Sequence, residues 1–403
     1  MNALGAALAR RVGEAGAIAV GLALIALFFA WAYAAPALWL LGFFVLALGA
    51  LDALYAARVL RKVALRRSAP SRARADWPFE IELELENRHL LAPLSGVLVR
   101  DALLGQAAAV TWAVFPWIGA GETRRVCTRL TARRRGLHRF EASLVRTGFP
   151  LGLWSAELQR LAPAEVLVHP RAGRIAEALF RRLEQLESAR RSRQATRSDE
   201  EFRGLREWRH GDHPKRIHWR RSARLGALVV KEFEEARSAR LTLVLSCVAQ
   251  RGKGAALAEE AISFAAALAQ ACQRRGLLLS LICGTSAAPQ VLEIGGGGAP
   301  LERALDRLAQ LELEAEAAPE TADALAQLPP RLFRERHVLC VAARATALPS
   351  EEQRARWRKL GAEVWSLPAD GREFTRYFAR ATPLERLESA RSASRAPRGS
   401  AAP

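Results

Sequence analysis

Residues 201–234 read EFRGLREWRHGDHPKRIHWRRSARLGALVVKEFE, and this stretch separates two parts of the sequence whose hydrophobic patterns differ. Between Arg203 and Arg224 it holds eight Arg or Lys residues against two acids, with two tryptophans and three of the seven histidines of the chain. Short alternating apolar runs precede the stretch, whereas continuous apolar runs that alternate with helical patterns follow it. The stretch is therefore predicted to join a β-rich domain to an α/β domain.

The chain has 403 residues and a formal net charge of +19. This length suffices for two soluble domains, because single cores usually stop growing at about 250–300 residues. The positive charge favours nucleic-acid binding, but membrane proteins also carry surplus Arg and Lys on their cytoplasmic flanks. The five cysteines are widely spaced and include no C-x-x-C pair, so they are predicted to be buried and reduced.

An apolar segment near the start of the sequence predicts two membrane-spanning helices. Residues 15–51 contain no charged side chain, and a spanning helix needs about 20 such residues. Pro36 divides the segment into predicted spans at residues 16–35 and 37–57. Basic residues flank the hairpin on both sides, so both of its ends are predicted to be cytoplasmic. The alternative is a cleavable signal peptide, because Ala32-Tyr33-Ala34 resembles a cleavage site.

The next segment predicts a small β-sandwich. Phe79, Ile81, Leu83 and Leu85 alternate with glutamates, which is the period-two pattern of a half-buried strand. Further short strands are predicted at residues 96–99, 107–114, 123–130, 140–144 and 165–169. The basic run that precedes them, residues 58–74, is predicted to be a solvated flank attracted to anionic lipid, with a nucleic-acid patch as the alternative.

The second half of the sequence predicts a doubly wound parallel sheet. Strands are predicted at residues 241–245, 277–282, 338–341 and 363–367. Helices are predicted between them at residues 255–274, 301–311 and 351–360, and alternation of this kind is typical of α/β folds. Before the Arg-rich stretch, residues 171–190 predict a helix with one apolar face.

The predicted protein is therefore multidomain. Its segments are a transmembrane helical hairpin (1–60), a basic juxtamembrane linker (61–76), a β-sandwich domain (77–170), a helix with the Arg-rich stretch (171–237), an α/β domain (238–388) and a disordered tail (389–403).

The Arg-rich stretch predicts a short helix. Asp212 can cap its free N–H groups, Pro214 suits the first turn, and Gly226 can end it. Arg216 and Arg224 then lie on one face together with Arg220, at positions i, i+8 and i+4.

This row of like charges requires negative partners. If these partners belong to the chain itself, they are carboxylates, and Arg206, Arg216 and Arg224 form ion pairs that fix two domains to each other. Outside the chain they are lipid headgroups, a nucleotide or an acidic protein surface. A nuclease would need clustered carboxylates to bind metal ions, and Glu207 with Asp212 is a weak candidate pair for them.

Metal binding is not expected in the Arg-rich stretch. Its three histidines have spacings that could approach one ion, but Pro214 interrupts the local geometry and no cysteine lies nearby. No cofactor is predicted elsewhere, since the glycine run at residues 295–298 lacks the Lys-Ser/Thr of a phosphate-binding loop.

The stretch resembles the signature of the bacterial domain-of-unknown-function 58 family. The matching residues are Phe202, Gly204, Arg206, Trp208, Gly211, Asp212, Arg216, Ile217, Trp219, Ser222, Ala223 and Arg224. A Thr-Gly-Phe-Pro-Leu-Gly-Leu segment at residues 147–153 also resembles the family. The resemblance implies a membrane hairpin, a β-domain and a von Willebrand A-like α/β domain, with the signature residues as candidates for interaction.

The sequence departs from that pattern in two places. At Trp208 the family more often has tyrosine, so the aromatic ring is kept and the phenol is lost. Where metal-binding von Willebrand A domains carry Asp-x-Ser-x-Ser, this chain has Ser246 and Gln250 at the ends and Val248 in the middle. Ca²⁺ and Mg²⁺ prefer several oxygen ligands including carboxylate, so this metal site is predicted to be degenerate.

The family's setting implies partners and a location. It is a bacterial inner membrane, with a MoxR-type AAA+ ATPase and a transglutaminase-like membrane protein encoded nearby. The leading hypothesis is a non-enzymatic scaffold with two membrane spans, whose cytoplasmic von Willebrand A-like domain binds such an ATPase. Nucleic-acid or nucleotide binding by the Arg-rich stretch is less favoured, and a hydrolase that uses Asp212 is less favoured still.

Overall fold

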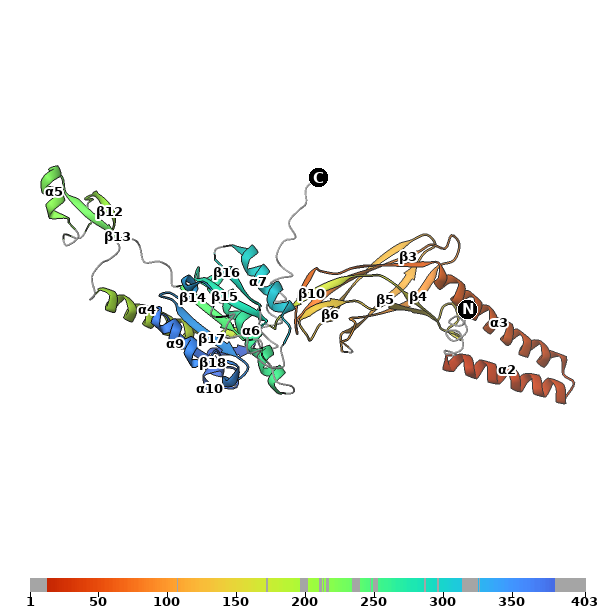
Figure 1. Ribbon diagram of the computed structural model, residues 1–403. Coiled ribbons are helices and arrows are strands. Elements are labelled where there is room, and N and C mark those ends of the chain that lie inside the picture. Colours follow the sequence, from red (N-terminus) through yellow and green to blue (C-terminus); the bar gives the residue numbers. More distant parts are fainter. Residues whose placement is uncertain are drawn as a thin grey trace. The chain divides into compact units, whose positions relative to one another are not determined.

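The computed structural model describes residues 13–380, apart from 107, 172, 196–201, 210–211, 213, 215–216, 234–239, 247, 249–252, 286–287, 296, 314–324 and 326. The chain divides into two compact units, one up to residue 171 and one from residue 172 to residue 383. Figure 1 shows a pair of long helices and a set of β-strands in the first unit, and a mixed α/β arrangement in the second.

The first unit begins with two apolar helices, α2 (Glu14–Ala32) and α3 (Pro36–Arg61). They pack on each other, and Pro36 occupies the first turn of α3, where its missing N–H costs nothing. Both are long and apolar enough to cross a membrane. Residues 254–274 also meet this criterion, but most of that helix is buried inside the second unit.

Ten strands follow in the described part of the first unit and form three sheets. In chain order they are β1 (Val63–Ser68), β2 (Arg72–Arg74), β3 (Pro78–Asn87), β4 (Leu94–Ala102), β5 (Val110–Ile118), β6 (Thr123–Thr131), β7 (Gly136–Arg139), β8 (Ser143–Thr147), β9 (Ala156–Arg160) and β10 (Glu165–His169). The sheet orders are β1-β3-β6, β5-β4-β8-β9 and β2-β10-β7. The four alternating apolar residues of β3 all point into the protein, as predicted.

The prediction that residues 61–76 form a solvated linker is wrong. Strand β1 pairs antiparallel with β3, and β2 pairs parallel with β10. Val63 and Leu65 are buried, and Arg66 lies opposite Glu84 of β3. Arg67 is drawn inside, where its side chain and that of Asp101 on β4 are both 0% exposed. The period-two pattern of β1 was not recognised because the segment is dense in basic residues. The negative partners of these residues come from other strands.

The second unit contains a five-stranded sheet in the order β16-β15-β14-β17-β18. Its strands are β14 (Arg240–Leu245), β15 (Leu278–Thr285), β16 (Ala288–Ile294), β17 (His337–Ala342) and β18 (Glu363–Pro368). All neighbouring pairs are parallel except β15 with β16. Strand β16 was not predicted, and it forms an antiparallel edge next to β15.

Helices cover both faces of this sheet. They are α4 (Glu177–Ala195), α6 (Lys253–Arg274), α7 (Gly298–Gln310), α9 (Glu351–Lys359) and α10 (Arg372–Tyr377), with short 3-10 turns at Pro330–Leu332 and Ala345–Ala347. Leu243 of β14 packs in a core with α4, α6 and α7, whereas Val244 packs in a second core with Trp357 of α9. Alternate residues therefore enter opposite cores, as in a sheet buried on both faces.

Four short strands and a helix also belong to the described part of the second unit. They are β11 (Gly173–Ile175), which pairs with β19 (Phe378–Arg380), and β12 (Phe202–Glu207), which pairs with β13 (Val229–Phe233), with α5 (Trp219–Leu225) between the last two in the chain. Cysteines 272, 283 and 340 are buried thiols as predicted, but Cys127 is exposed on β6.

Candidate functional site

The Arg-rich stretch forms a small lobe, which we define as residues 202–233. Strands β12 and β13 form an antiparallel pair that contains the register Arg206 opposite Val230, and α5 connects them (Figure 1). Val229 and Val230 favour a strand because their side chains are β-branched. Helix α5 ends at Gly226, whose φ of 67° is the left-handed conformation that glycine adopts readily.

Asp212 ties the turn after β12 back onto that strand. Its carboxylate accepts hydrogen bonds from both terminal nitrogens of Arg206, at 2.6 and 2.7 Å, and from the backbone N–H of Arg209 at 2.8 Å. This arrangement matches the planar fork of a guanidinium. The arginine of the signature is therefore held by the aspartate of the same signature.

The prediction that Asp212 caps the helix is wrong. Helix α5 begins at Trp219, and the side chain of His218 caps it by accepting from the N–H of Arg221 at 3.3 Å. Asp212 lies too far back along the chain to reach these N–H groups and binds Arg206 instead. His218 was not predicted as the cap, because histidine is not among the favoured capping residues.

Ser222 fastens α5 to β13 and is buried. Its hydroxyl oxygen accepts from the N–H of Val229 at 2.9 Å, and the hydroxyl donates to the carbonyl of His218 at 3.2 Å. The N–H of His218 in turn donates to the carbonyl of Val229 at 2.8 Å. The serine of the signature is thus a structural residue that closes the lobe.

The lobe exposes aromatic, aliphatic and cationic side chains. Trp219 is 64% exposed, Leu225 is 60% exposed and Leu228 is 44% exposed. Arg220 and Arg224 of α5 are also exposed, and within the described part of the chain neither has a hydrogen bond or ion pair. We call these five residues the α5 face.

Two further predicted signature residues, Trp208 and Ala223, also lie in the lobe. The N–H of Trp208 donates to the carbonyl of Leu228 at 2.8 Å, and Ala223 is exposed. Gly211 and Arg216 lie outside the described residues. Arg220 and Arg224 of the predicted three-arginine row lie on α5.

The carboxyl end of β14 is the place where the sheet order reverses, and ligands of doubly wound sheets bind at such edges. Ser246 follows β14 there, is half-buried, and donates its N–H to the carbonyl of Val341 at 2.9 Å. Val248 is half-buried as well, and Gln250 lies outside the described residues. Among the residues that the structure describes, no three His, Cys, Asp or Glu side chains are grouped so that they could hold a metal ion.

The contacts of Asp212 lower its pKa. The hydrogen bond from Arg206 is the largest cause, followed by that from the Arg209 backbone, and the pKa of the carboxyl falls from 3.8 to about 2. The group is therefore ionised at neutral pH.

We expect the Arg206–Asp212 pair to survive until the pH approaches about 2. The folded pKa lies below the unfolded one, so the stabilisation is complete above pH about 4 and is lost as the pH falls through the folded value. Carboxyl carbon NMR of the full chain labelled at aspartate measures this midpoint. Asp212→Asn removes the signal and identifies it, and a midpoint near pH 4 would contradict the pairing.

Comparison with known proteins supports the family that the signature indicates. Residues 204–353 match the model of a family described as "Protein of unknown function DUF58". The matched range begins within β12, continues through the lobe, and extends into α9. No curated protein matches the sequence significantly.

Several solved structures resemble parts of the chain. They include the CARDB domain of PF1109 from Pyrococcus furiosus (14% identity, covering 27% of this chain and 94% of that one, TM-score 0.20), red sea bream transglutaminase (16%, 27% and 15%, 0.20) and the superoxide reductase neelaredoxin from Ignicoccus hospitalis (15%, 27% and 85%, 0.18). TM-scores this low assign neither an overall fold nor an activity to the chain.

Proposed function

We propose that this protein is a non-enzymatic scaffold of the bacterial inner membrane whose α5 face binds a partner protein in the cytoplasm. The partner that the family resemblance implies is a MoxR-type AAA+ ATPase, with a transglutaminase-like membrane protein as a further member of the assembly. The observation that carries the proposal is the exposure of Trp219 on the same short helix as two exposed arginines, Arg220 and Arg224, that have no partner among the described residues.

The membrane anchor is supported by α2 and α3, which are long and apolar enough to span a bilayer. Helix α3 ends in Arg58 and Arg61, and basic residues at the end of a span favour the cytoplasmic side. We infer two spans with both soluble parts in the cytoplasm.

The α5 face has the composition of a protein-binding surface. Tryptophan and arginine are the residue types that most often dominate binding energy at protein interfaces. Leu225 and Leu228 add apolar area, and Arg220 and Arg224 favour a partner with an acidic rim. Among the side chains of the lobe that the structure describes, only Ser222, Val229 and Val230 are buried, so its exposed large residues are available to a partner.

The von Willebrand A-like assignment belongs to this proposal. It is supported by a mainly parallel sheet that is covered on both faces and whose order reverses beside β14. Because the motif at residues 246–250 lacks a carboxylate, we propose that partner binding by this domain is independent of metal.

The hydrolase alternative is weakened by the environment of Asp212. Its oxygens already accept from Arg206 and from the Arg209 backbone, and its pKa of about 2 makes it a poor proton acceptor at neutral pH. We therefore assign Asp212 a structural role.

Trp219→Ala is expected to weaken binding of a purified MoxR-type ATPase from the same organism about thirtyfold or more. An interface tryptophan at a hot spot contributes about 2 kcal/mol or more, and about 1.4 kcal/mol is tenfold in Kd. Biolayer interferometry on the full-length protein in detergent measures the change. Arg224→Glu is expected to weaken binding by repulsion from an acidic partner.

Matched controls use exposed residues elsewhere. Trp112→Ala removes a tryptophan that is 54% exposed on β5, and Arg356→Glu reverses an exposed charge on α9. Both should bind as the wild type does. No binding by the wild type, or equal losses in controls and variants, would exclude the proposal. If the wild type instead retains single-stranded DNA, with steep salt dependence and dependence on Trp219, nucleic acid replaces the ATPase as the ligand.

A further inference from the structure

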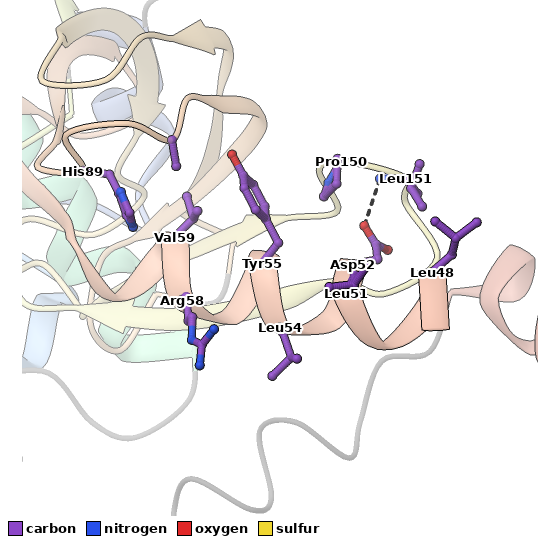
Figure 2. A pocket seen from close by; sticks show the side chains of 11 residues that line it. Leu48, Leu51, Asp52, Leu54, Tyr55, Arg58, Val59, His89, Pro150 and Leu151 are labelled. Atoms are coloured by element: carbon purple, nitrogen blue, oxygen red, sulfur yellow. Dashed lines mark hydrogen bonds between the residues drawn. The ribbon is translucent and has the colours of Figure 1, made fainter. Parts of the chain in front are cut away.

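A cavity lies in the first unit where α3 meets the loops of the β-domain. Its volume is about 490 Å³, and its lining is mostly apolar. One wall is α3, and the other wall is built from the loop that contains His89 and from the Pro150-Leu151 turn (Figure 2).

Buried hydrogen bonds hold these walls together. The carboxylate of Asp52, which is 1% exposed, accepts from the N–H groups of Leu151, Leu153 and Trp154 at 2.9, 3.0 and 3.0 Å. On the other side of the cavity the hydroxyl of Tyr55 donates to the carbonyl of Pro93 at 2.9 Å. Both loops are thus fastened to α3 at fixed points, so the cavity is a built feature of the unit.

The lining changes in polarity along the helix. Leu48, Leu51 and Leu54 line the part nearer the middle of α3, and Arg58 lines the part nearer its end, about 15 Å along the helix axis from Leu48 and about 6 Å from Leu54. Figure 2 shows His89 at the same end as Arg58. Within the described part of the chain, the guanidinium of Arg58 has no hydrogen bond or ion pair.

The surroundings of the cavity are apolar where a soluble domain would ordinarily be polar. Leu90 and Leu91 follow His89 in the same loop and are 85% and 91% exposed, and Leu151 is 53% exposed. Exposed leucines on loops beside the end of an apolar helix are suited to the boundary between headgroups and acyl chains.

We propose that this cavity binds an anionic phospholipid. The acyl chain lies along Leu48, Leu51 and Leu54, and the phosphate is bound by Arg58. A cation at the end of a chain-sized apolar channel is complementary to a molecule with one charged end and one apolar end. The inference rests on the membrane anchoring proposed above, because a lipid reaches this cavity only if α3 is in a bilayer.

The test uses the full-length protein in a neutral detergent, titrated with dioctanoyl phosphatidylglycerol and followed by native mass spectrometry. Dioctanoyl phosphatidylcholine shares the chains but lacks the net charge, and inorganic phosphate shares the anion but lacks the chains. We expect phosphatidylglycerol to bind at least about tenfold more tightly than phosphatidylcholine. We expect phosphate to compete only weakly.

Arg58→Gln is expected to weaken phosphatidylglycerol binding about tenfold, because it removes the charged donor. Arg61→Gln is the matched control, since it makes the same charge change at an exposed position of the same helix that does not line the cavity. Leu51→Trp fills the apolar part and should abolish binding of the chain while leaving the charge unchanged.

Equal losses in the Arg58 and Arg61 variants would reduce the effect to diffuse charge attraction and overturn the site. Equal affinities for the two lipids would overturn it as well. Alkaline carbonate extraction of cell membranes tests the anchor separately: if the wild-type chain is extracted, the proposed anchoring fails whatever the lipid titration shows. If the Arg58→Gln and Leu51→Trp variants stay in the membrane and bind lipid as the wild type does, only the lipid site fails.

Discussion

In full-length protein carrying Asp52→Ala, the backbone amides of Leu151, Leu153 and Trp154 are expected to lose their protection from hydrogen exchange. The buried carboxylate is the acceptor of all three N–H groups. An alanine leaves three donors without an acceptor, and each lost partner costs about 1–3 kcal/mol. Opening of this loop should therefore become at least about a hundredfold more frequent.

Hydrogen exchange with mass spectrometry measures this effect on peptides from residues 148–155. Asp52→Asn keeps one carbonyl oxygen and should give a smaller increase. Peptides from β4 and β5 serve as an internal control, because their ladder does not involve Asp52. Unchanged protection of the loop in the alanine variant would show that the three hydrogen bonds do not hold it to α3.

Arg67→Met is expected to lower the melting temperature of the first unit by more than about 10 °C. Arg67 of β1 donates from Nε to Oδ2 of Asp101 at 2.8 Å and from a terminal nitrogen to the hydroxyl of Ser143 at 2.7 Å. Its guanidinium carbon also lies 4.4 Å from the ring centroid of Phe140. Removing one member of a fully buried pair leaves an uncompensated charge, which costs about 3–5 kcal/mol.

The double variant Arg67→Met with Asp101→Leu tests the cause. It removes both charges, so most of the lost stability should return. Arg66→Met is the surface control, because the Arg66 side chain is 72% exposed and its 4.0 Å contact with Glu84 should contribute about 1 kcal/mol or less. Scanning fluorimetry of the tryptophans follows unfolding. Equal melting of the single and double variants would show that the unpaired charge is not the source of the loss.

The roles of Asp52 and Arg67 cannot be recognised from a hydropathy pattern. Asp52 interrupts an apolar helix, and its partners are backbone groups about a hundred residues away in the chain. Arg67 is one of several arginines in a basic run, and only its place on β1 distinguishes it from Arg66. In both cases the deciding contact is between distant segments.

In the lobe, one end of the helix was predicted from the sequence, whereas the other end was decided by a tertiary contact. Gly226 was predicted to end the helix, as it does. The start of the helix was misplaced because Asp212, a favourable capping residue, is bound to Arg206 of the preceding strand. A local preference was overridden by a stronger charge-assisted contact.

The sequence by itself determined the two apolar helices, the alternating strand β3 and the mixed α/β second half. Each of these follows from the period or length of an apolar run, which depends only on neighbouring residues. Only the tertiary structure decided that the basic run becomes β1 and β2, that β16 closes one edge of the sheet, and that Asp52 binds a loop. Those outcomes depend on which distant donors, acceptors and charges folding brings together, and a buried and an exposed arginine have the same letter in the sequence.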